Sequence, residues 1–194
     1  MRTKICGITS LKDALIAIDA GADALGFVFY EKSPRYITPD DAQKIISKLP
    51  PFIEKVALFV NQEAKIIDSI CKKTGATLAQ LHFNVSQSFC NSLYTPYIKV
   101  SRAQKAEDIL EYKDEYRLVD AYCEAYGGAG KRINIEWFKG IDCSKIILAG
   151  GLTSFNVSTL KEYGFFGVDV SSGVEISHGI KDINKVKEFI KNAK

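Results

Sequence analysis

A thiol and a carboxylate, far apart in the sequence, are the two side chains best suited to proton transfer. Cys6 ends a strand-like segment and is followed at once by Gly7 and a helix start, so its thiol can point into a cleft at the carboxyl end of a strand. Asp120 ends the apolar run Leu118-Val119, where burying a carboxylate is costly without a partner or a task. The alternative for Cys6 is a small buried hydrophobic residue. Used together, the two groups predict an enzyme that moves protons.

Two glycine-rich loops further along the chain could hold a phosphate group. One follows the apolar run 146–149, and the other follows the apolar run 166–170. Both loops offer backbone N–H groups that no bulky side chain covers. The loops after strands 7 and 8 are also where α/β barrels usually bind phosphate. The alternative is two ordinary glycine-rich turns, but the paired positions favour a phosphate site on a sugar-phosphate enzyme, made by Gly150, Gly151, Ser172 and Gly173.

Three more polar side chains are candidate substrate ligands. Arg35 lies in the loop 32–36 after the second strand, where Pro34 stiffens the chain. A stiffened loop favours a carboxylate clamp over a solvated arginine. His82 ends the fourth strand, and a purely structural histidine is an equally good interpretation. Asp169 lies in the strand that leads into the second phosphate loop, and we group it with Arg35 and His82 as substrate-binding.

The composition excludes several classes of protein. The net charge of +3 is small and evenly scattered, which argues against nucleic acid or a membrane surface as a partner. No apolar run approaches the roughly 18–20 residues of a membrane span. The five cysteines form no C-x-x-C pair, which argues against a disulfide framework or a zinc site and for the reducing cytoplasm. No cluster of His, Cys and Asp has ligand spacing either, so we expect no metal.

Eight strand-like segments alternate with helical patterns along the chain. Several are continuously apolar, such as Val56-Ala57-Leu58-Phe59-Val60, which is typical of strands covered on both faces and favours a parallel sheet. The expected strands are 3–6, 24–29, 55–60, 78–82, 97–100, 116–121, 145–149 and 166–170.

The expected helices carry caps and apolar faces. Ser10 caps the first, which Gly21 can end, and Thr38-Pro39 opens the second. A third helical face begins near residue 64 and is followed by Gly75, which can terminate it. Further helices are expected from about 153 to 164 and over 183–190, with weaker segments at 86–93, 103–112 and 135–139.

This alternation predicts an α/β fold, a single (β/α)8 TIM barrel over residues 1–194 with active residues on the loops that follow the strands. The alternative is an open doubly wound sheet, which would want a G-x-G-x-x-G turn after an early strand, and the sequence has none. The segment 127–131 superficially suggests a nucleotide-binding loop. It lacks the G-x4-G-K-[ST] spacing and is followed by Arg132 where Ser or Thr belongs.

In order along nearly the whole chain, these segments resemble the phosphoribosylanthranilate isomerase family, barrel enzymes of tryptophan biosynthesis. The most specific blocks are KICGIT at 4–9, KSPRY at 32–36 and GVDVSSGVE at 167–175. The other matching blocks are 21–29, 59–61, 80–82, 120–122, 127–128 with 130–131, and 148–152. Their combination is far more specific than any single loop.

The resemblance implies a reaction and a role for each candidate residue. It makes Cys6 the general base and Asp120 the general acid, with Arg35 on the anthranilate carboxylate and the two glycine loops on the phosphate. The implied reaction is an Amadori rearrangement of N-(5-phosphoribosyl)anthranilate to 1-(2-carboxyphenylamino)-1-deoxyribulose 5-phosphate, without metal or cofactor. One group must be protonated and the other deprotonated at neutral pH, which demands unlike environments. A thiol is mostly protonated in water, so Cys6 needs a positive local field.

The chain departs from the family pattern at Phe83, Ala129 and Glu136, where glycine, threonine and aspartate are usual. Phe83 follows His82 and bears on the fit of the anthranilate ring.

The related histidine-pathway isomerase is one alternative, but it would use two carboxylates and a second glycine-rich phosphate loop, which residues 61–63 do not provide. A non-catalytic sugar-phosphate binder would need neither Cys6 nor Asp120. We expect a small-molecule substrate and a monomer or a homodimer.

Overall fold

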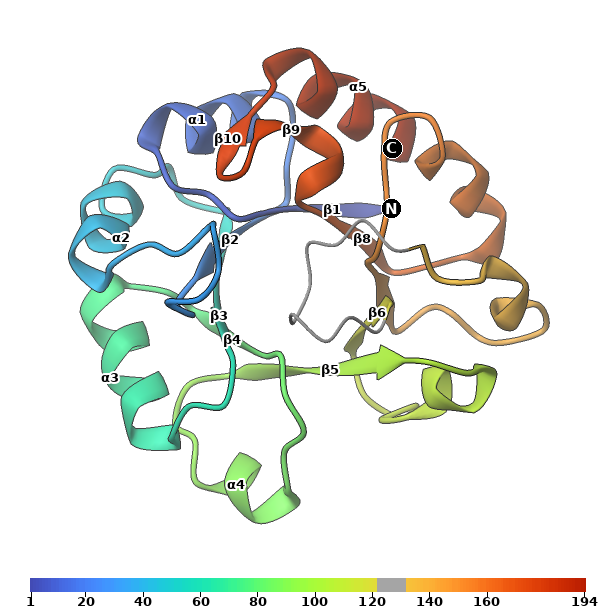
Figure 1. The fold of residues 1–194 in the computed structure, drawn as a ribbon, viewed down its shortest axis with the longest axis horizontal. Helices are drawn as coiled ribbons and strands as arrows, with labels where there is room; N and C mark the ends of the chain where they lie inside the picture. Colours follow the sequence, from blue (N-terminus) through green and yellow to red (C-terminus); the bar gives the residue numbers. More distant parts are fainter. Residues whose placement is uncertain (122–131) are drawn as a thin grey trace.

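Eight parallel strands close into a barrel in the computed structural model of this chain, which describes residues 1–121 and 132–194 (Figure 1). Strands that follow one another pair in order from β1 to β8, and β8 pairs back to β1. The predicted (β/α)8 barrel is confirmed. The strands are β1 Arg2–Cys6, β2 Ala24–Val28, β3 Glu54–Phe59, β4 Leu78–Leu81, β5 Tyr97–Ala103, β6 Arg117–Ala121, β7 Ile146–Leu148 and β8 Gly167–Val170.

All eight expected strands are present, and most ends differ from expectation by one residue. The exception is β5, which was expected to stop at Val100 and runs on to Ala103. Its last residues pair with β6, with Arg102 opposite Asp120 and Ala103 opposite Ala121. Pairing with β6 therefore makes Ala103, the first residue of the weak helical segment expected at 103–112, part of a strand. The local sequence pattern could not predict this, because it carries no information about the partner strand.

Helices surround the ring of strands (Figure 1). Ser10 and Thr38 cap their helices as predicted, because each side-chain oxygen accepts a hydrogen bond from the backbone N–H three residues on. Gly75 ends α3 in the left-handed conformation, with φ 78°. The helices are α1 Leu11–Asp19, α2 Pro39–Ile46, α3 Ala64–Thr74, α4 Gln87–Asn91 and α5 Ile183–Ala193.

Within residues 1–121 and 132–194, four connections contain 3₁₀ turns: η1 Ala106–Leu110, η2 Ile135–Phe138, η3 Val157–Tyr163 and η4 Ser172–Val174. The helix expected from about residue 153 is thus the shorter η3, ending at Gly164 with φ 70°. Its start is delayed because the chain first makes a turn closed by Asn156. The Asn156 side chain accepts from the N–H of Thr153 and donates to the carbonyl oxygen of Gly151.

A short hairpin between β8 and α5 was not foreseen from the sequence. It consists of β9 Glu175–Ser177 and β10 Ile180–Lys181, which pair antiparallel. Contacts to the opposite end of the sequence hold it: Thr9 Oγ1 donates to the Gly179 carbonyl at 2.6 Å, and the Lys181 N–H donates to Asp13 Oδ2 at 3.3 Å. The hairpin therefore fastens the segment after the last strand to the segment after the first.

Alternation along the strands separates two apolar regions. Side chains such as Ile5, Phe27 and Val119 point outward into the large core beneath the helices. Inside the barrel, Cys6 packs with Val28, Leu58, Val60 and Tyr30 in one cluster, and a second cluster contains Ile98, Val100, Leu118 and Ala149. Because alternate residues face inward, β1 also sends Lys4 and β8 sends Asp169 into the barrel.

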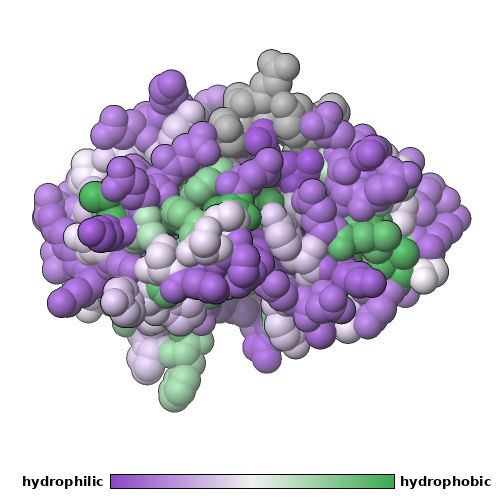
Figure 2. Space-filling view, turned by 90° about the horizontal axis from the view of Figure 1, so that it is seen from below, coloured by the Kyte–Doolittle hydropathy of each residue, from purple (hydrophilic) through white to green (hydrophobic). Residues whose placement is uncertain are grey.

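The outer surface in Figure 2 is largely hydrophilic, with hydrophobic residues gathered in separate patches. Within the described residues, no helix combines the length and the apolar character that a membrane crossing requires.

Candidate active site

The carboxyl ends of β1, β6, β7 and β8 bring the candidate residues to one mouth of the barrel. Cys6 is the last residue of β1 and is buried, and Asp120 lies one residue before the end of β6. Gly150-Gly151 follows β7 after Ala149, and Ser171-Ser172 directly follows β8. Parallel strands in a closed barrel all end on the same face, so residues more than a hundred positions apart become neighbours. The structure thus places these candidates on the face expected of them.

Asp120 lies in an environment that favours its protonated form. Burial is the main cause, and the nearby charge of Asp169 adds to it, so that the pKa of Asp120 rises to about 7. The Ala121 N–H and the cations Arg102 and Lys4 oppose this rise without cancelling it. Gly150 allows the close approach of β7, since a Cβ there would lie 3.0 Å from Asp120 Oδ1. The carboxyl group can therefore hold a proton near neutral pH.

His82 is buried beside Asp120, with its Nε2 3.7 Å from Asp120 Oδ2. Burial, together with the charges of Arg102 and Lys4, lowers the pKa of His82 to about 3. The imidazole is therefore neutral at physiological pH, and the contact is neither an ion pair nor, at this distance, a direct hydrogen bond. Its predicted role as a substrate ligand stays a prediction.

Asp169 is paired within the chain. Its Oδ1 accepts a hydrogen bond from Lys4 Nζ at 2.9 Å, and both side chains are buried. Burial alone would lower the pKa of Lys4, but the charges and hydrogen bonds of Asp169 and Cys6 together outweigh it and raise the value to about 12. The two carboxylates of the mouth thus differ: Asp169 has a cationic partner, whereas Asp120 tends to keep its proton. The predicted contact of Asp169 with substrate remains a prediction.

The Cys6 thiol is held by close packing on β2. Cys6 lies opposite Gly26 in the strand register, and a Cβ on Gly26 would come within 2.7 Å of the sulfur and 3.0 Å of Lys4 Nζ. Burial raises the pKa of Cys6, and Asp169 raises it further, while the ammonium groups of Lys4 and Lys181 lower it. Since burial prevails, the thiol form dominates, and only a small fraction of molecules pairs a thiolate with a protonated Asp120.

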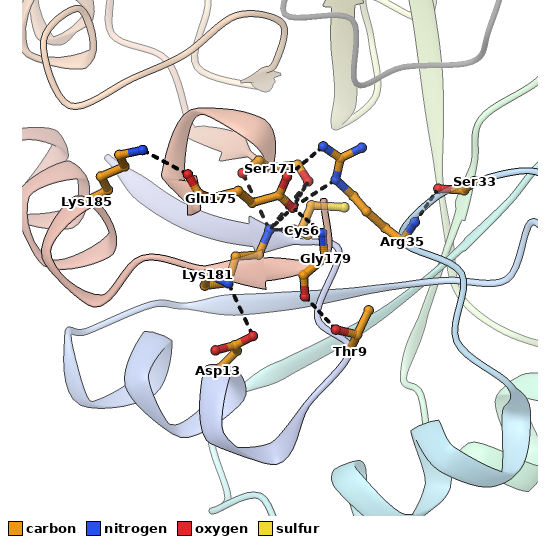
Figure 3. Close-up of polar contacts among 10 residues, drawn as sticks. All are labelled: Cys6, Thr9, Asp13, Ser33, Arg35, Ser171, Glu175, Gly179, Lys181 and Lys185. Carbon is orange, nitrogen blue, oxygen red and sulfur yellow. Dashed lines mark hydrogen bonds and ion pairs between the residues drawn. The ribbon is translucent and has the colours of Figure 1, made fainter. Parts of the chain in front are cut away.

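Arg35 is buried rather than solvated. Its guanidinium group forms a bidentate ion pair with Glu175, from Nε to Oε1 at 2.9 Å and from Nη2 to Oε2 at 2.7 Å (Figure 3). The side chain passes over Gly7, where a Cβ would come within 2.6 Å of Arg35 Cδ. This fork geometry fixes the plane of the guanidinium group. A rigid arginine at the mouth suits the predicted carboxylate clamp, although Glu175 is the partner that the structure records.

The two glycine loops meet each other. Gly150 and Gly151 both have positive φ, at 91° and 63°, a conformation that side chains other than glycine rarely adopt. Gly173 lies in η4, and a Cβ there would overlap the carbonyl oxygen of Leu152. The loops after β7 and β8 therefore pack without side chains between them, as a single anion site would require.

No group of three or more His, Cys, Asp or Glu side chains in the described parts of the chain could hold a metal ion. Residues 122–131 lie outside the described parts. They include Cys123, the glycines at 127, 128 and 130 that contribute to the family resemblance, and Ala129, which departs from it.

Comparison with known proteins decides the family. A sequence model of the N-(5'-phosphoribosyl)anthranilate isomerase family matches residues 3–192. The chain belongs to this family. Curated family members from Sulfurovum sp. and Nitratiruptor sp. are 60% and 62% identical to it, each over the whole chain and 99% of the relative.

Solved structures of family members agree with the fold. The Thermotoga maritima isomerase is 39% identical, with a TM-score of 0.90 over 100% of this chain and 98% of that one. A phosphoribosyl anthranilate isomerase in complex with reduced 1-(o-carboxyphenylamino)-1-deoxyribulose 5-phosphate is 38% identical, with a TM-score of 0.86 over the same shares of each chain. The resemblance drawn from sequence motifs is therefore confirmed.

Sequence reasoning missed three buried ions beside the candidate site of this isomerase: Lys4, Glu175 and Lys181. Each contacts a residue that is distant in sequence, so no local spacing predicts the pairing. Lys4 did carry a signal, because a lysine two residues before Cys6 on the same strand must face the same side. Glu175 and Lys181 lie in the hairpin that the sequence did not reveal.

We expect Gly26→Ala to lower kcat while the barrel stays folded, because the added methyl group must displace the Cys6 sulfur or Lys4 Nζ. Steady-state kinetics together with circular dichroism measure both. Gly140→Ala is the control: its Cβ meets nothing within 4 Å, yet φ is 75°, so it strains the backbone without touching the site. Equal kcat in the two variants would contradict the importance of this contact.

Proposed function

We propose that Cys6 and Asp120 carry out the acid–base steps by which this chain isomerises N-(5'-phosphoribosyl)anthranilate in tryptophan biosynthesis. The observation that carries the assignment is the environment of Asp120, where burial and Asp169 raise the pKa to about 7. The first step of the rearrangement needs an acid that still holds its proton near neutral pH. A carboxyl group in water would already have lost it.

The steps balance between the two groups. Asp120 gives its proton to the ribose ring oxygen, and the ring opens as the anthranilate nitrogen forms a double bond to C1. Cys6, as thiolate, removes the proton from C2, and the electron pair of that C–H bond moves through C2–C1 to the nitrogen, leaving an enol. The enol hydroxyl then loses its proton to Asp120 while C1 gains the proton from Cys6. The product is 1-(2-carboxyphenylamino)-1-deoxyribulose 5-phosphate, and both groups return to their starting states.

The remaining candidates fit the two anionic ends of this substrate. Arg35 is rigid and cationic at the mouth, and its ion pair with Glu175 uses only Nε and Nη2, so Nη1 is the nitrogen suited to the anthranilate carboxylate. The adjoining glycine loops supply backbone N–H groups for the phosphate. Gly150, Gly151, Ser172 and Gly173 keep their proposed role as that site, and His82 and Asp169 keep theirs as substrate ligands.

We expect Cys6→Ala and Asp120→Asn each to lower kcat by about a hundredfold or more, as loss of a proton-transfer group does. Loss of anthranilate-sugar fluorescence follows the reaction, and KM should change little. For the unaltered chain, kcat/KM should rise with pH up to about 7, the pKa of Asp120, and fall above the higher pKa of the thiol. The profile has this shape because the active form of the enzyme combines a thiolate with a carboxylic acid. The lower pKa of the profile is then that of the acid, and the higher pKa is that of the base. Near-normal turnover in either variant would remove that residue from the mechanism.

We expect Gly151→Val to raise KM strongly, because a branched side chain would fill the space of the anion, and inorganic phosphate to inhibit competitively. Gly164→Val is the matched control. It has a similar left-handed backbone, with φ 70° against 63°, and its Cβ would meet nothing within 4 Å. If both variants bind substrate alike, or if phosphate does not compete, the phosphate site lies elsewhere.

A homodimer is the oligomeric state that the opposite face of the barrel favours. A hollow of about 610 Å³ opens at the amino ends of the strands, and Phe52 on its rim is fully exposed with a positive φ of 65°. Such an aromatic side chain can enter the hollow of a second copy. The Thermotoga maritima isomerase is described as dimeric. The apolar lining includes Val56, Leu78, Ile98, Leu118, Ile147 and Val168.

We expect sedimentation analysis to find a dimer for the unaltered chain and a monomer for Phe52→Asp, with kcat retained because the site lies at the other mouth. Phe155→Asp controls for added charge at another exposed phenylalanine. A monomeric unaltered chain would refute the dimer.

The cytoplasmic location expected from the unpaired cysteines stays a proposal; the described cysteines are free and buried.

A further inference from the structure

A buried ionic cluster of Arg35, Glu175 and Lys181 lies against Cys6 (Figure 3). Lys181 comes from β10, and its side chain is completely buried. Its Nζ donates to Glu175 Oε1 at 2.8 Å, to the Cys6 carbonyl oxygen at 2.5 Å and to the Ser171 carbonyl oxygen at 3.4 Å. One ammonium group therefore joins the end of β1, the end of β8 and the partner of Arg35.

The charges of this cluster do not cancel. Glu175 is a single carboxylate that faces two cations, Arg35 and Lys181. Hydrogen bonds from Arg35 and the charge of Lys181 lower the pKa of Glu175 against the effect of burial, so it carries a full negative charge at neutral pH. Burial lowers the pKa of Lys181, and the charge of Glu175 opposes this effect. With both Arg35 and Lys181 protonated, the cluster has one positive charge in excess. Buried charges are normally compensated, which calls for a further negative group at this place.

Among the residues that the structure describes, Cys6 is the ionisable group best placed to supply that negative charge. The buried Asp13 accepts only from the main-chain N–H of Lys181, at 3.3 Å. The charged and titratable groups that face it are Lys4 on its own strand, Asp169 on β8, Lys181 on β10 and Tyr30 after β2. Lys4 is already paired one-to-one with Asp169. In the substrate-free chain, the uncompensated charge therefore lies on the side of Cys6 occupied by Lys181 and Arg35.

We propose that Lys181 is a positioning residue for Cys6: it holds the strand end that carries the thiol and favours the thiolate that the base needs. Glu175 moderates this effect, because it shares its charge between Lys181 and Arg35. The effect of Lys181 on catalysis rests on the proposed function, in which Cys6 is the base. Its effect on the ionisation of Cys6 does not, because that ionisation can be measured without turnover.

Two substitutions test the proposal in opposite directions. In Lys181→Met the positive charge is lost, so the thiol pKa of Cys6 should rise by about one unit or more. In Glu175→Gln a negative charge is lost at nearly constant shape, so the same pKa should fall. Thiolate absorbance in the ultraviolet, taken as the difference between each variant and its Cys6→Ser counterpart, reports Cys6 without the other cysteines. Circular dichroism checks the fold.

Lys185→Met is the matched control. Lys185 also contacts Glu175, but through the main-chain carbonyl oxygen at 2.8 Å, so its removal should leave the Cys6 titration unchanged. A purely structural role for Lys181 would leave the thiol pKa unmoved or shift it the same way in both test variants, and either result overturns the proposal. Should Lys181→Met fail to fold, the fall expected in Glu175→Gln still decides.

Kinetics separate this proposal from the catalytic assignment. If Cys6 is the base, each unit of rise in its pKa should lower the plateau of kcat/KM about tenfold, while the ascending limb near the pKa of Asp120 stays in place. Should the titration shift as expected while kcat/KM does not respond, Lys181 sets the ionisation of Cys6 as proposed and the base of the reaction is another group.

Discussion

Removal of water from the barrel mouth is the constraint on which the chemistry depends. The same burial raises the pKa of Asp120 to about 7, raises that of Cys6, and lowers that of His82 to about 3. It therefore favours the neutral form of all three groups. This serves an acid, but it works against a base. The site consequently needs local charges that treat the thiol and the carboxyl group differently, and the buried ions supply them.

The effect of these buried ions on the pKa values of Cys6 and Asp120 depends on where each ion lies and not on their net charge. Lys4 and Asp169 neutralise one another, so their pair stabilises both charges while it leaves the net charge unaltered. Asp169 nevertheless helps Asp120 to keep its proton, and Lys4 donates a hydrogen bond toward Cys6. At Cys6 the charge of Lys4 outweighs that of Asp169, and at Asp120 the charge of Asp169 outweighs that of Lys4. One ion pair thus favours the thiolate of Cys6 and the acid form of Asp120, as their proposed roles require.

The sequence predicted what is local and missed what is distant. Continuous apolar runs located all eight strands, and the order of strands placed Cys6 and Asp120 at one mouth, because parallel strands share their carboxyl face. The contacts of Lys4 with Asp169, Arg35 with Glu175 and Lys181 with Cys6 join residues 165, 140 and 175 positions apart. No periodicity records such pairs. Lys181 was further hidden because a two-residue strand leaves almost no pattern.

These distant pairs all cross the seam where the barrel closes. The seam joins β8 to β1, and the hairpin that follows β8 reaches back to Thr9 and Asp13 beside the first helix. Cys6 lies on one side of the seam and the ions that adjust it lie on the other. Before the last strand and hairpin dock, Cys6 lacks Lys181, Lys4 lacks Asp169, and Arg35 lacks Glu175. Closing the barrel and assembling the surroundings of Cys6 are therefore one event, and loosening the hairpin should affect the ionisation of Cys6 before it affects the rest of the barrel.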